Sequence, residues 1–275
     1  MCKELKNHAI NIRKNIVEMI AKSKSGHPGG SLSSVEILTY LYFKEMNINK
    51  DNLDSKERDY FVLSKGHAAP VLYSTLSEAG FIPKEELMTL RTLGSNLQGH
   101  PDSKRIKAVD VSTGSLGQGI SNAVGIAIGA KIDNSNTRVY TLLGDGELQE
   151  GLVWEAAMSA AHYKLDNLVA FIDYNNLQID GKNEDVMNIK PLDKKFEGFG
   201  WNVLIIDGHS FKDLEKSLKN ARETKDKPTV IIANTVKGKG VSFMENNAGW
   251  HGSAPNAQQR DQAIEEIEAM RKECL

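Results

Sequence analysis

The 275-residue chain carries 34 basic and 36 acidic residues, a formal charge of -2, which excludes the strong positive field that nucleic-acid binding requires. Its only cysteines, Cys2 and Cys274, lie near opposite ends and provide neither a disulfide framework nor a cysteine metal site. The charged N-terminus lacks the apolar core of a signal peptide, and the most apolar run, AVGIAIGA, is too short to cross a bilayer. We therefore expect a soluble, cytoplasmic protein.

Apolar periodicity predicts the elements in chain order. Residues 5–20 place apolar side chains at steps of three and four, which indicates an amphipathic helix ending near the glycines of SGHPGG. Short apolar runs rich in β-branched residues then alternate with helical stretches, at 60–63, 139–143, 168–172, 203–206 and 229–233. This alternation is typical of a parallel sheet flanked by helices. No linker or repeat divides the chain, so we expect one α/β domain over residues 1–275, closed by an amphipathic helix at 255–275.

Asp145 and Asn175 follow two consecutive predicted strands, in the motifs GDG and NN. Because one βαβ unit separates them, both turns should lie at the same edge of the sheet, outside the carboxyl ends of its strands. Magnesium takes hard oxygen ligands and is usually completed by substrate phosphates and water. Glycines on both sides of Asp145 would let the main chain approach a diphosphate closely. Each motif alone is ordinary turn chemistry, but the two together favour a magnesium and diphosphate site.

Four of the seven histidines occupy turns that contain glycine or proline: His27, His67, His100 and His251. Histidine titrates near neutrality and can donate to or accept from sugar hydroxyls, so several histidines in one pocket suit proton transfers on carbohydrates. His8 and His162 belong to helical patterns and are given no role in a site. His209 precedes a helix whose N-cap is predicted to be Ser210.

Six blocks of the sequence, in order along nearly the whole chain, resemble the transketolase family. They are SGHPGGSLSSVEIL, FVLSKGHAAPVLY, QGHPD, STGSLGQGISNAVG, GDGELQEG followed by IDYNNLQIDG, and AGWHGSAP. The resemblance implies the thiamine diphosphate-binding fold, in the form of its diphosphate-binding domain. It also implies thiamine diphosphate and Mg²⁺ as cofactors, and leaves other divalent cations open.

The same resemblance implies roles for individual residues. The metal would be held by the side chains of Asp145 and Asn175 and by the main-chain carbonyl of Leu177, and Asn176 is a rival to Asn175. The cofactor would contact His67, Gly114, Ser115, Leu116, Gly146, Asn175, Ile179 and His251. At the substrate end, the resemblance assigns proton transfer to His27 and His251, and contact with a substrate hydroxyl to His100.

No block of the chain resembles the second domain of the family, which supplies the glutamate that activates the aminopyrimidine of the cofactor. We therefore expect the N-terminal subunit of a split transketolase, which moves a two-carbon ketol unit from a ketose phosphate to an aldose phosphate, for example between pentose phosphates. A second chain with the pyrimidine-binding domain would complete the enzyme, as a two-fold pair of heterodimers. Glu150 and Glu155 lie at the start of a predicted helix, where carboxylates are stabilised by the positive end of the helix dipole. By the resemblance, they match glutamates that meet across the subunit interface of transketolases.

Several alternatives stay open on the sequence alone. The α subunit of a 2-oxo acid dehydrogenase shares the GDG and NN motifs, but the histidines of GHP and KGHA favour a polyhydroxylated substrate. A ketol transferase for an unusual sugar, or a fragment of a deoxyxylulose phosphate synthase, is harder to distinguish from a transketolase by these motifs. A cofactor-binding module without catalysis would need neither His27 nor His251.

Overall fold

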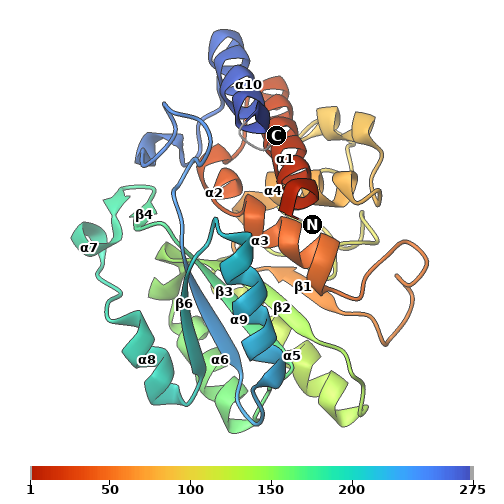
Figure 1. Ribbon diagram of the computed structural model, residues 1–275, viewed down its shortest axis with the longest axis vertical. Coiled ribbons are helices and arrows are strands. Elements are labelled where there is room, and N and C mark those ends of the chain that lie inside the picture. The colour runs from red at the N-terminus through yellow and green to blue at the C-terminus, as the bar shows by residue number, and fades with distance from the viewer. Residues whose placement is uncertain (1, 273–275) are drawn as a thin grey trace.

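The computed structural model describes residues 2–272, which form a parallel sheet covered by helices on both faces (Figure 1). The described part of the chain contains one five-stranded sheet in the order β1-β2-β3-β7-β6, and each neighbouring pair in it is parallel. Its strands are β1 (Tyr60–Leu63), β2 (Val139–Gly144), β3 (Leu168–Tyr174), β6 (Asn202–Asp207) and β7 (Thr229–Asn234). The predicted fold class and all five predicted strands are confirmed.

The central strands are apolar along their length because both of their faces are buried. In β2, Tyr140 and Leu142 belong to one hydrophobic core, whereas Val139 and Leu143 belong to the other. A parallel sheet with helices on both sides requires such uninterrupted apolar strands, since no face is left for polar side chains. The sheet therefore separates two cores.

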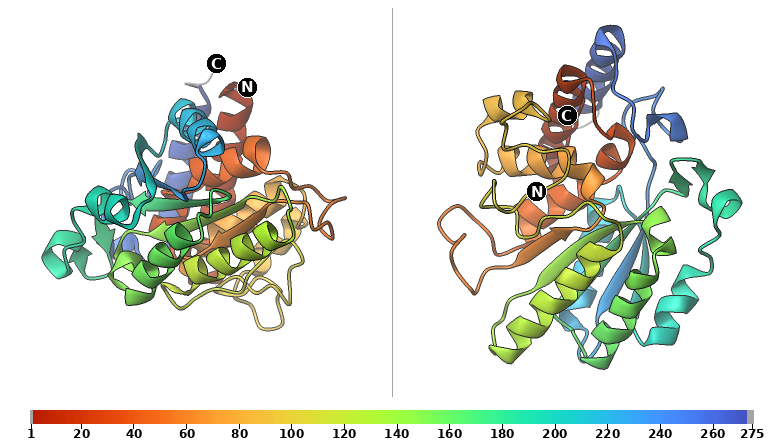
Figure 2. Two further views of the ribbon diagram at one scale, coloured as in Figure 1. Left: turned by 90° about the horizontal axis from the view of Figure 1, so that it is seen from below. Right: turned by 180° about the vertical axis from the view of Figure 1, so that it is seen from behind.

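The helices divide between the two faces of the sheet (Figures 1 and 2). One core contains residues of α5 (Gln118–Ile132), α6 (Gly151–His162) and α8 (Leu192–Phe199). The other contains residues of α1 (Cys2–Ser23), α3 (Val35–Tyr40), α4 (Ala69–Glu78), α9 (Phe211–Glu223) and α10 (Ala257–Lys272). Two shorter helices, α2 (Pro28–Leu32) and α7 (Asn183–Val186), lie in loops near the carboxyl ends of the strands.

Both predicted terminal helices are present. Ile12, Ile16 and Ile20 of α1 are fully buried, and α1 packs against α10. The last three residues of the predicted C-terminal helix, Cys274 among them, lie outside the described residues. The side chain of Ser210 accepts a hydrogen bond from the N–H of Asp213 at 3.2 Å, which confirms it as the N-cap of α9.

The register of the sheet brings the carboxyl ends of its middle strands level with one another. Gly144 at the end of β2 is paired with Asp173 of β3, and Tyr174 at the end of β3 is paired with Asn234 of β7. The loops that follow these three strands therefore begin side by side at one edge, which is where open α/β sheets bind ligands.

We predict that Phe171→Ala lowers the free energy of unfolding by about 3–5 kcal/mol, because it leaves a cavity in the middle of the sheet. Phe171 is completely buried in β3. Leu93 is fully exposed, so Leu93→Ala is the matched control and should change stability by about 0.5 kcal/mol or less. Urea unfolding measures both; a loss for Phe171→Ala no larger than that of the control would contradict this description of the core.

Candidate cofactor and substrate site

Asp145 follows β2 directly and is almost completely buried at the start of the turn Gly146–Gln149. Its Oδ1 accepts a hydrogen bond from the N–H of Gly146 at 2.8 Å, and its Oδ2 accepts one from the N–H of Asn176 at 2.5 Å. Burial, followed by the neighbouring Asp173 carboxylate, raises the pKa of Asp145 to about 6. A carboxylate held in such surroundings is stabilised by a cation, so its chemistry fits a metal ligand.

The two asparagines that follow β3 differ in placement. The Asn175 side chain is buried and lines the same cavity as Asp145, while its Nδ2 donates to Asp173 at 3.0 Å and its Oδ1 accepts from the N–H of Leu177 at 3.1 Å. Asn176 has a left-handed backbone, with φ of 65°, and an exposed side chain. The main-chain N–H of Asn176 therefore orients Asp145, but its side chain does not line the cavity.

Leu177 begins a short antiparallel pair, β4 (Leu177–Gln178) with β5 (Gly181–Lys182). Together with Asp145 and Asn175, its carbonyl gives the cavity a carboxylate, an amide and a carbonyl oxygen, which are the hard donors that Mg²⁺ takes in proteins. Within residues 2–272, no group of three or more His, Cys, Asp and Glu side chains could hold a metal. The donor set fits a magnesium ion that is completed by phosphate oxygens.

A cavity of about 390 Å³ at the carboxyl edge of the sheet collects most of the predicted site residues. Those that line it are His27, His67, Gly114, Leu116, Asp145, Gly146, Asn175, Leu177, Ile179 and His251. His100 and Ser115 do not line it. The ring of His100 lies behind the Gly114 loop, since a Cβ built on Gly114 would lie 3.4 Å from it, and the Ser115 side chain is exposed.

Three histidine rings meet at one side of this cavity. The ring centroids of His27, His67 and His251 are 5.1–5.5 Å apart, and the rings of His67 and His251 are stacked. Burial, and after it the nearby cationic groups, lowers the pKa of His251 to about 3 and that of His27 to about 4. All three rings are therefore neutral at pH 7, each with one nitrogen that donates and one that accepts.

Arg91 contacts the outer side of the histidine cluster. Its guanidinium lies 3.4 Å from Nδ1 of His27 and donates to the Ser25 hydroxyl at 3.2 Å. A guanidinium can only donate, so Nδ1 of His27 accepts and Nε2 carries the proton. The buried Nδ1 of His251 makes no hydrogen bond to the described part of the chain.

Sequence reasoning missed a buried ion pair under the cavity. Lys65 and Asp173 are both almost completely buried, and Lys65 Nζ lies 2.6 Å from Asp173 Oδ2. Lys65 also donates to the carbonyl of Gly30 at 2.7 Å and to the hydroxyl of Ser34 at 2.6 Å. Burial acts to raise the pKa of Asp173, but Lys65 outweighs it and the pKa is lowered. Lys65 belongs to the motif VLSKGH and Asp173 to the motif FIDYNN, from which only the histidine and the asparagines were predicted as site residues.

Lys237 was also missed. It follows β7 and is 2 % exposed, and its Nζ donates to the Leu177 carbonyl at 3.2 Å at the wall of the cavity. Burial lowers the pKa of Lys237 to about 8. A signal was available, because the sequence TVIIANTVKGKG predicts a strand whose carboxyl end would meet the same edge as GDG and NN.

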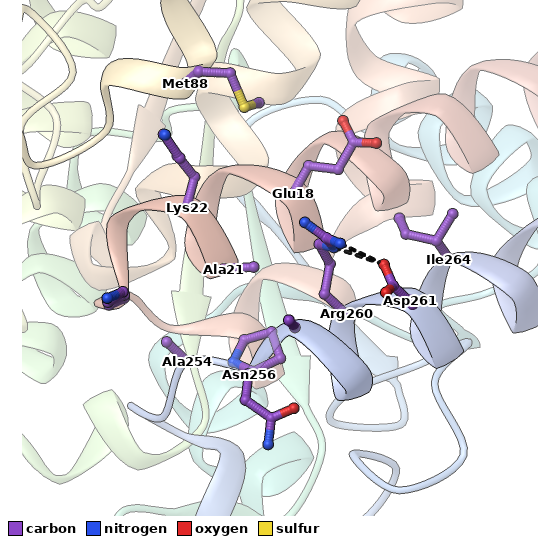
Figure 3. Close-up of a pocket in the computed structure, with 12 residues that line it drawn as sticks. Glu18, Ala21, Lys22, Met88, Ala254, Asn256, Arg260, Asp261 and Ile264 are labelled. Atoms are coloured by element: carbon purple, nitrogen blue, oxygen red, sulfur yellow. Dashed lines mark hydrogen bonds and ion pairs between the residues drawn. The ribbon is translucent and has the colours of Figure 1, made fainter.

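A larger cavity, of about 940 Å³, lies away from these residues, between α1 and α10 (Figure 3). Its wall mixes basic, acidic and apolar side chains, and Arg260 is paired there with its neighbour Asp261 at 2.6 Å. None of the predicted site residues lines it. Size therefore does not decide which cavity carries the chemistry.

Hard oxygen donors and a histidine cluster share one cavity at the carboxyl edge of a parallel sheet, which is where α/β proteins of this class bind their ligands. A family model described as "Transketolase, thiamine diphosphate binding domain" matches residues 5–272, and the chain belongs to the transketolase family. The resemblance noted in the sequence is confirmed.

Two relatives are subunits of transketolases and match this chain over most of their own length. An apulose-4-phosphate transketolase subunit of Phocaeicola vulgatus is 45% identical over 255 residues, which cover 93% of this chain and 90% of the relative. The 6-deoxy-6-sulfo-D-fructose transketolase subunit SqwG of Clostridium sp. is 43% identical over 265 residues, which cover 96% of each. The prediction of a transferase of the transketolase family is confirmed.

Other relatives are much longer chains. Human transketolase is 43% identical over 267 residues, which cover 96% of this chain but 42% of the human protein. The crystal structure of a Pichia stipitis transketolase in complex with sedoheptulose-7-phosphate superposes with a TM-score of 0.90 at 31% identity, covering 99% of this chain and 44% of that one. Within residues 2–272, no helix is both long enough and apolar enough to span a bilayer.

We predict that His251→Asn reduces the loss of stability on acidification. The pKa of His251 is about 3 in the folded protein and about 6.5 in an unfolded chain. As the pH falls below about 6.5, the unfolded chain takes up a proton at this position that the folded one does not, so folding is weakened until the folded pKa is reached. Urea unfolding at pH 7 and pH 5 measures the change in each protein. An equal loss in the variant and the original would show that His251 is not held neutral.

Proposed function

We propose that this chain is the thiamine diphosphate-binding subunit of a two-chain transketolase that moves a two-carbon ketol unit from a ketose phosphate to an aldose phosphate. The proposal rests on one observation: a single cavity is lined by oxygen donors, a buried lysine and three neutral histidines. The donors and the lysine are Asp145, Asn175, Leu177 and Lys237. We further propose that residues 1–275 act as one domain. A cytoplasmic location stays a prediction.

Asp145, the Asn175 side chain and the Leu177 carbonyl would hold the magnesium ion, and Asn175 is preferred to Asn176 because only its side chain lines the cavity. Lys237 would donate to the diphosphate, since its buried ammonium lies at the wall of the same cavity. Gly114, Leu116 and Ile179 supply main-chain and apolar walls. When bound, thiamine diphosphate supplies the carbon atom that carries the ketol unit between the two sugars.

The histidines would serve the sugar substrates. Because Nδ1 of His27 accepts a hydrogen bond from Arg91, its Nε2 carries the proton and can donate it in a hydrogen bond to a substrate oxygen. His251 lies against it and, being neutral, can accept or return a proton at a sugar hydroxyl. His67 stacks on His251 at the cavity wall, and we assign it to the cofactor. His100 does not line the cavity, and its role as a contact to a substrate hydroxyl stays a prediction.

A partner chain with a pyrimidine-binding domain would cover the open side of the site. Ile179, which lines the cavity, is 68% exposed, and Met187, which does not, is 61% exposed. On α5, a Cβ built on Gly125 or Gly129 would meet nothing within 4 Å, so this helix surface is open to close approach by another chain. Exposed apolar side chains beside a ligand site are typical of a surface that another subunit covers.

The same proposal extends to assembly. Glu150 lines the cavity at the start of α6, and Glu155 is exposed one turn further along that helix. The outer side of α6 also exposes Met158, at 57%. We propose that this surface lies at the two-fold axis of a heterotetramer made of two heterodimers.

A second candidate function concerns the sugar. Two similar subunits are named for apulose-4-phosphate and 6-deoxy-6-sulfo-D-fructose. Both compounds are sugars that carry an anionic group, a phosphate or a sulfonate, and neither is one of the common pentose phosphates. The present chain therefore also fits a ketol transferase for an unusual anionic ketose, and the assay must include such substrates.

We predict that the purified chain, with thiamine diphosphate and Mg²⁺, transfers no ketol unit by itself, and that activity appears when it is assembled with a chain that carries the pyrimidine-binding domain. Product sugars are measured by chromatography for pentose phosphates, apulose-4-phosphate and 6-deoxy-6-sulfo-D-fructose. Activity with one donor only would identify the substrate class.

Two variants make this assay specific. Asp145→Asn should remove the activity of the assembled enzyme, because a formal charge on the metal is lost. Asp180→Asn changes an exposed carboxylate in the same segment and should leave the activity intact. Ketol transfer by the single chain, or full activity of the Asp145→Asn enzyme, would contradict the proposal.

A further inference from the structure

The loop after β7 is held at two points by side chains from distant parts of the sequence. The main-chain N–H of Val236 donates to Nε2 of His209 at 2.9 Å. Three residues later, the carbonyl of Lys239 accepts a hydrogen bond from Nε of Arg13 at 3.1 Å. Lys237 lies between these two contacts, so its position depends on both of them.

The two anchors belong to one buried network. Arg13 is 1% exposed and contacts both carboxylate oxygens of Glu36, at 2.7 Å and 2.8 Å. His209 Nδ1 lies 2.9 Å from Oε2 of the same carboxylate. Burial acts to raise the pKa of Glu36, but Arg13 and the hydrogen bond from His209 outweigh it and lower the pKa to about 2. Glu36 therefore stays charged and holds both anchors at once.

The tautomer of His209 follows from its two partners. An amide N–H can only donate, so Nε2 of His209 must be the bare nitrogen that accepts from Val236. Nδ1 then carries the proton and donates to Glu36. Both ring nitrogens are used, and the start of α9 does not need the ring, because Ser210 provides the N-cap.

The loop between the anchors has little freedom. Gly238 has a left-handed backbone with φ of 79°, and a Cβ built on it would lie 2.4 Å from the Met244 carbonyl. Its N–H donates to the carbonyl of Gly29 at 3.0 Å. The Lys237 side chain leaves this rigid segment and reaches the Leu177 carbonyl at the cavity wall. A displacement of the anchors would therefore move the Lys237 ammonium.

We propose that His209 is a positioning residue which, with Glu36 and Arg13, sets the place of the Lys237 ammonium in the cofactor cavity. The inference rests on the proposed function, in which Lys237 binds the diphosphate. His209 touches neither cofactor nor substrate and acts only through Lys237.

The test compares His209→Leu, His209→Gln, Lys237→Met and the double variant His209→Leu/Lys237→Met in the assembled enzyme. The measured quantity is the dissociation constant of thiamine diphosphate at saturating Mg²⁺, by titration calorimetry. His209→Leu should raise it by about 10-fold to 100-fold, the usual effect of removing a residue that orients a ligating group. His209→Gln keeps an oxygen within reach of the Val236 N–H and should restore most of the affinity.

The decisive comparison is the double variant. If His209 acts through Lys237, the double variant should bind no more weakly than Lys237→Met alone, because the two changes remove one and the same contact. Ser210→Ala is the matched control: it removes the neighbouring helix cap and should leave the dissociation constant unchanged. Circular dichroism establishes that each variant is folded.

Two kinds of result would overturn the inference in different ways. If Lys237→Met weakens binding while His209→Leu does not, or if the two effects multiply, then His209 does not position Lys237 and the proposed function is untouched. If Lys237→Met leaves cofactor affinity unchanged, the assignment of Lys237 to the diphosphate fails as well.

Discussion

The hydrogen bond from the Asn176 N–H to the Asp145 carboxylate joins the loops after β2 and β3, and the candidate site is built around it. The parallel register makes this bond geometrically available, since it brings the ends of the two strands level. The bond fixes one carboxylate oxygen, turns the Asn176 side chain outward and leaves Asn175 facing the cavity. Without it, Asp145 in the loop after β2 would not be joined to the loop after β3 that carries Asn175 and Leu177.

Charge balance explains why so many ionisable groups can be buried at this edge. Asp173 is matched by Lys65, and Glu147 accepts hydrogen bonds from Ser64 and from the N–H groups of Gly117 and Gly144. Asp145 has no such ion-pair partner within residues 2–272, which is why burial raises its pKa. The region therefore suits the binding of a cation together with an anionic ligand, such as a metal ion with a diphosphate.

The sequence predicted the strands and Asp145 because these depend on local patterns. An apolar run followed by GDG needs no knowledge of distant residues, and the spacing to Asn175 equals one βαβ unit. Lys237 and His209 were missed as members of the site because their partners, Leu177 and Glu36, lie 60 and 173 residues away along the chain. Such contacts become visible only when the strand order is known, and β7 lies next to β3 although β6 and several helices come between them in sequence.

The histidines of the site are neutral, so each ring carries its proton on one of its two nitrogens. His27 and His251 keep low pKa values because burial and neighbouring cations disfavour a further positive charge. The cations among these neighbours, such as Lys237, also favour the negative charge of a diphosphate, whereas burial disfavours a charge of either sign. Binding of cofactor and neutrality of the histidines are thus two consequences of one electrostatic arrangement.

The most direct measurement is a crystal structure of the assembled enzyme with thiamine diphosphate and Mn²⁺ in place of Mg²⁺, in which anomalous scattering locates the metal. We expect one anomalous peak bonded to the carboxylate of Asp145, the side-chain oxygen of Asn175 and the carbonyl of Leu177, with Lys237 on the diphosphate. A peak bonded elsewhere, or a diphosphate that does not reach Lys237, would contradict it.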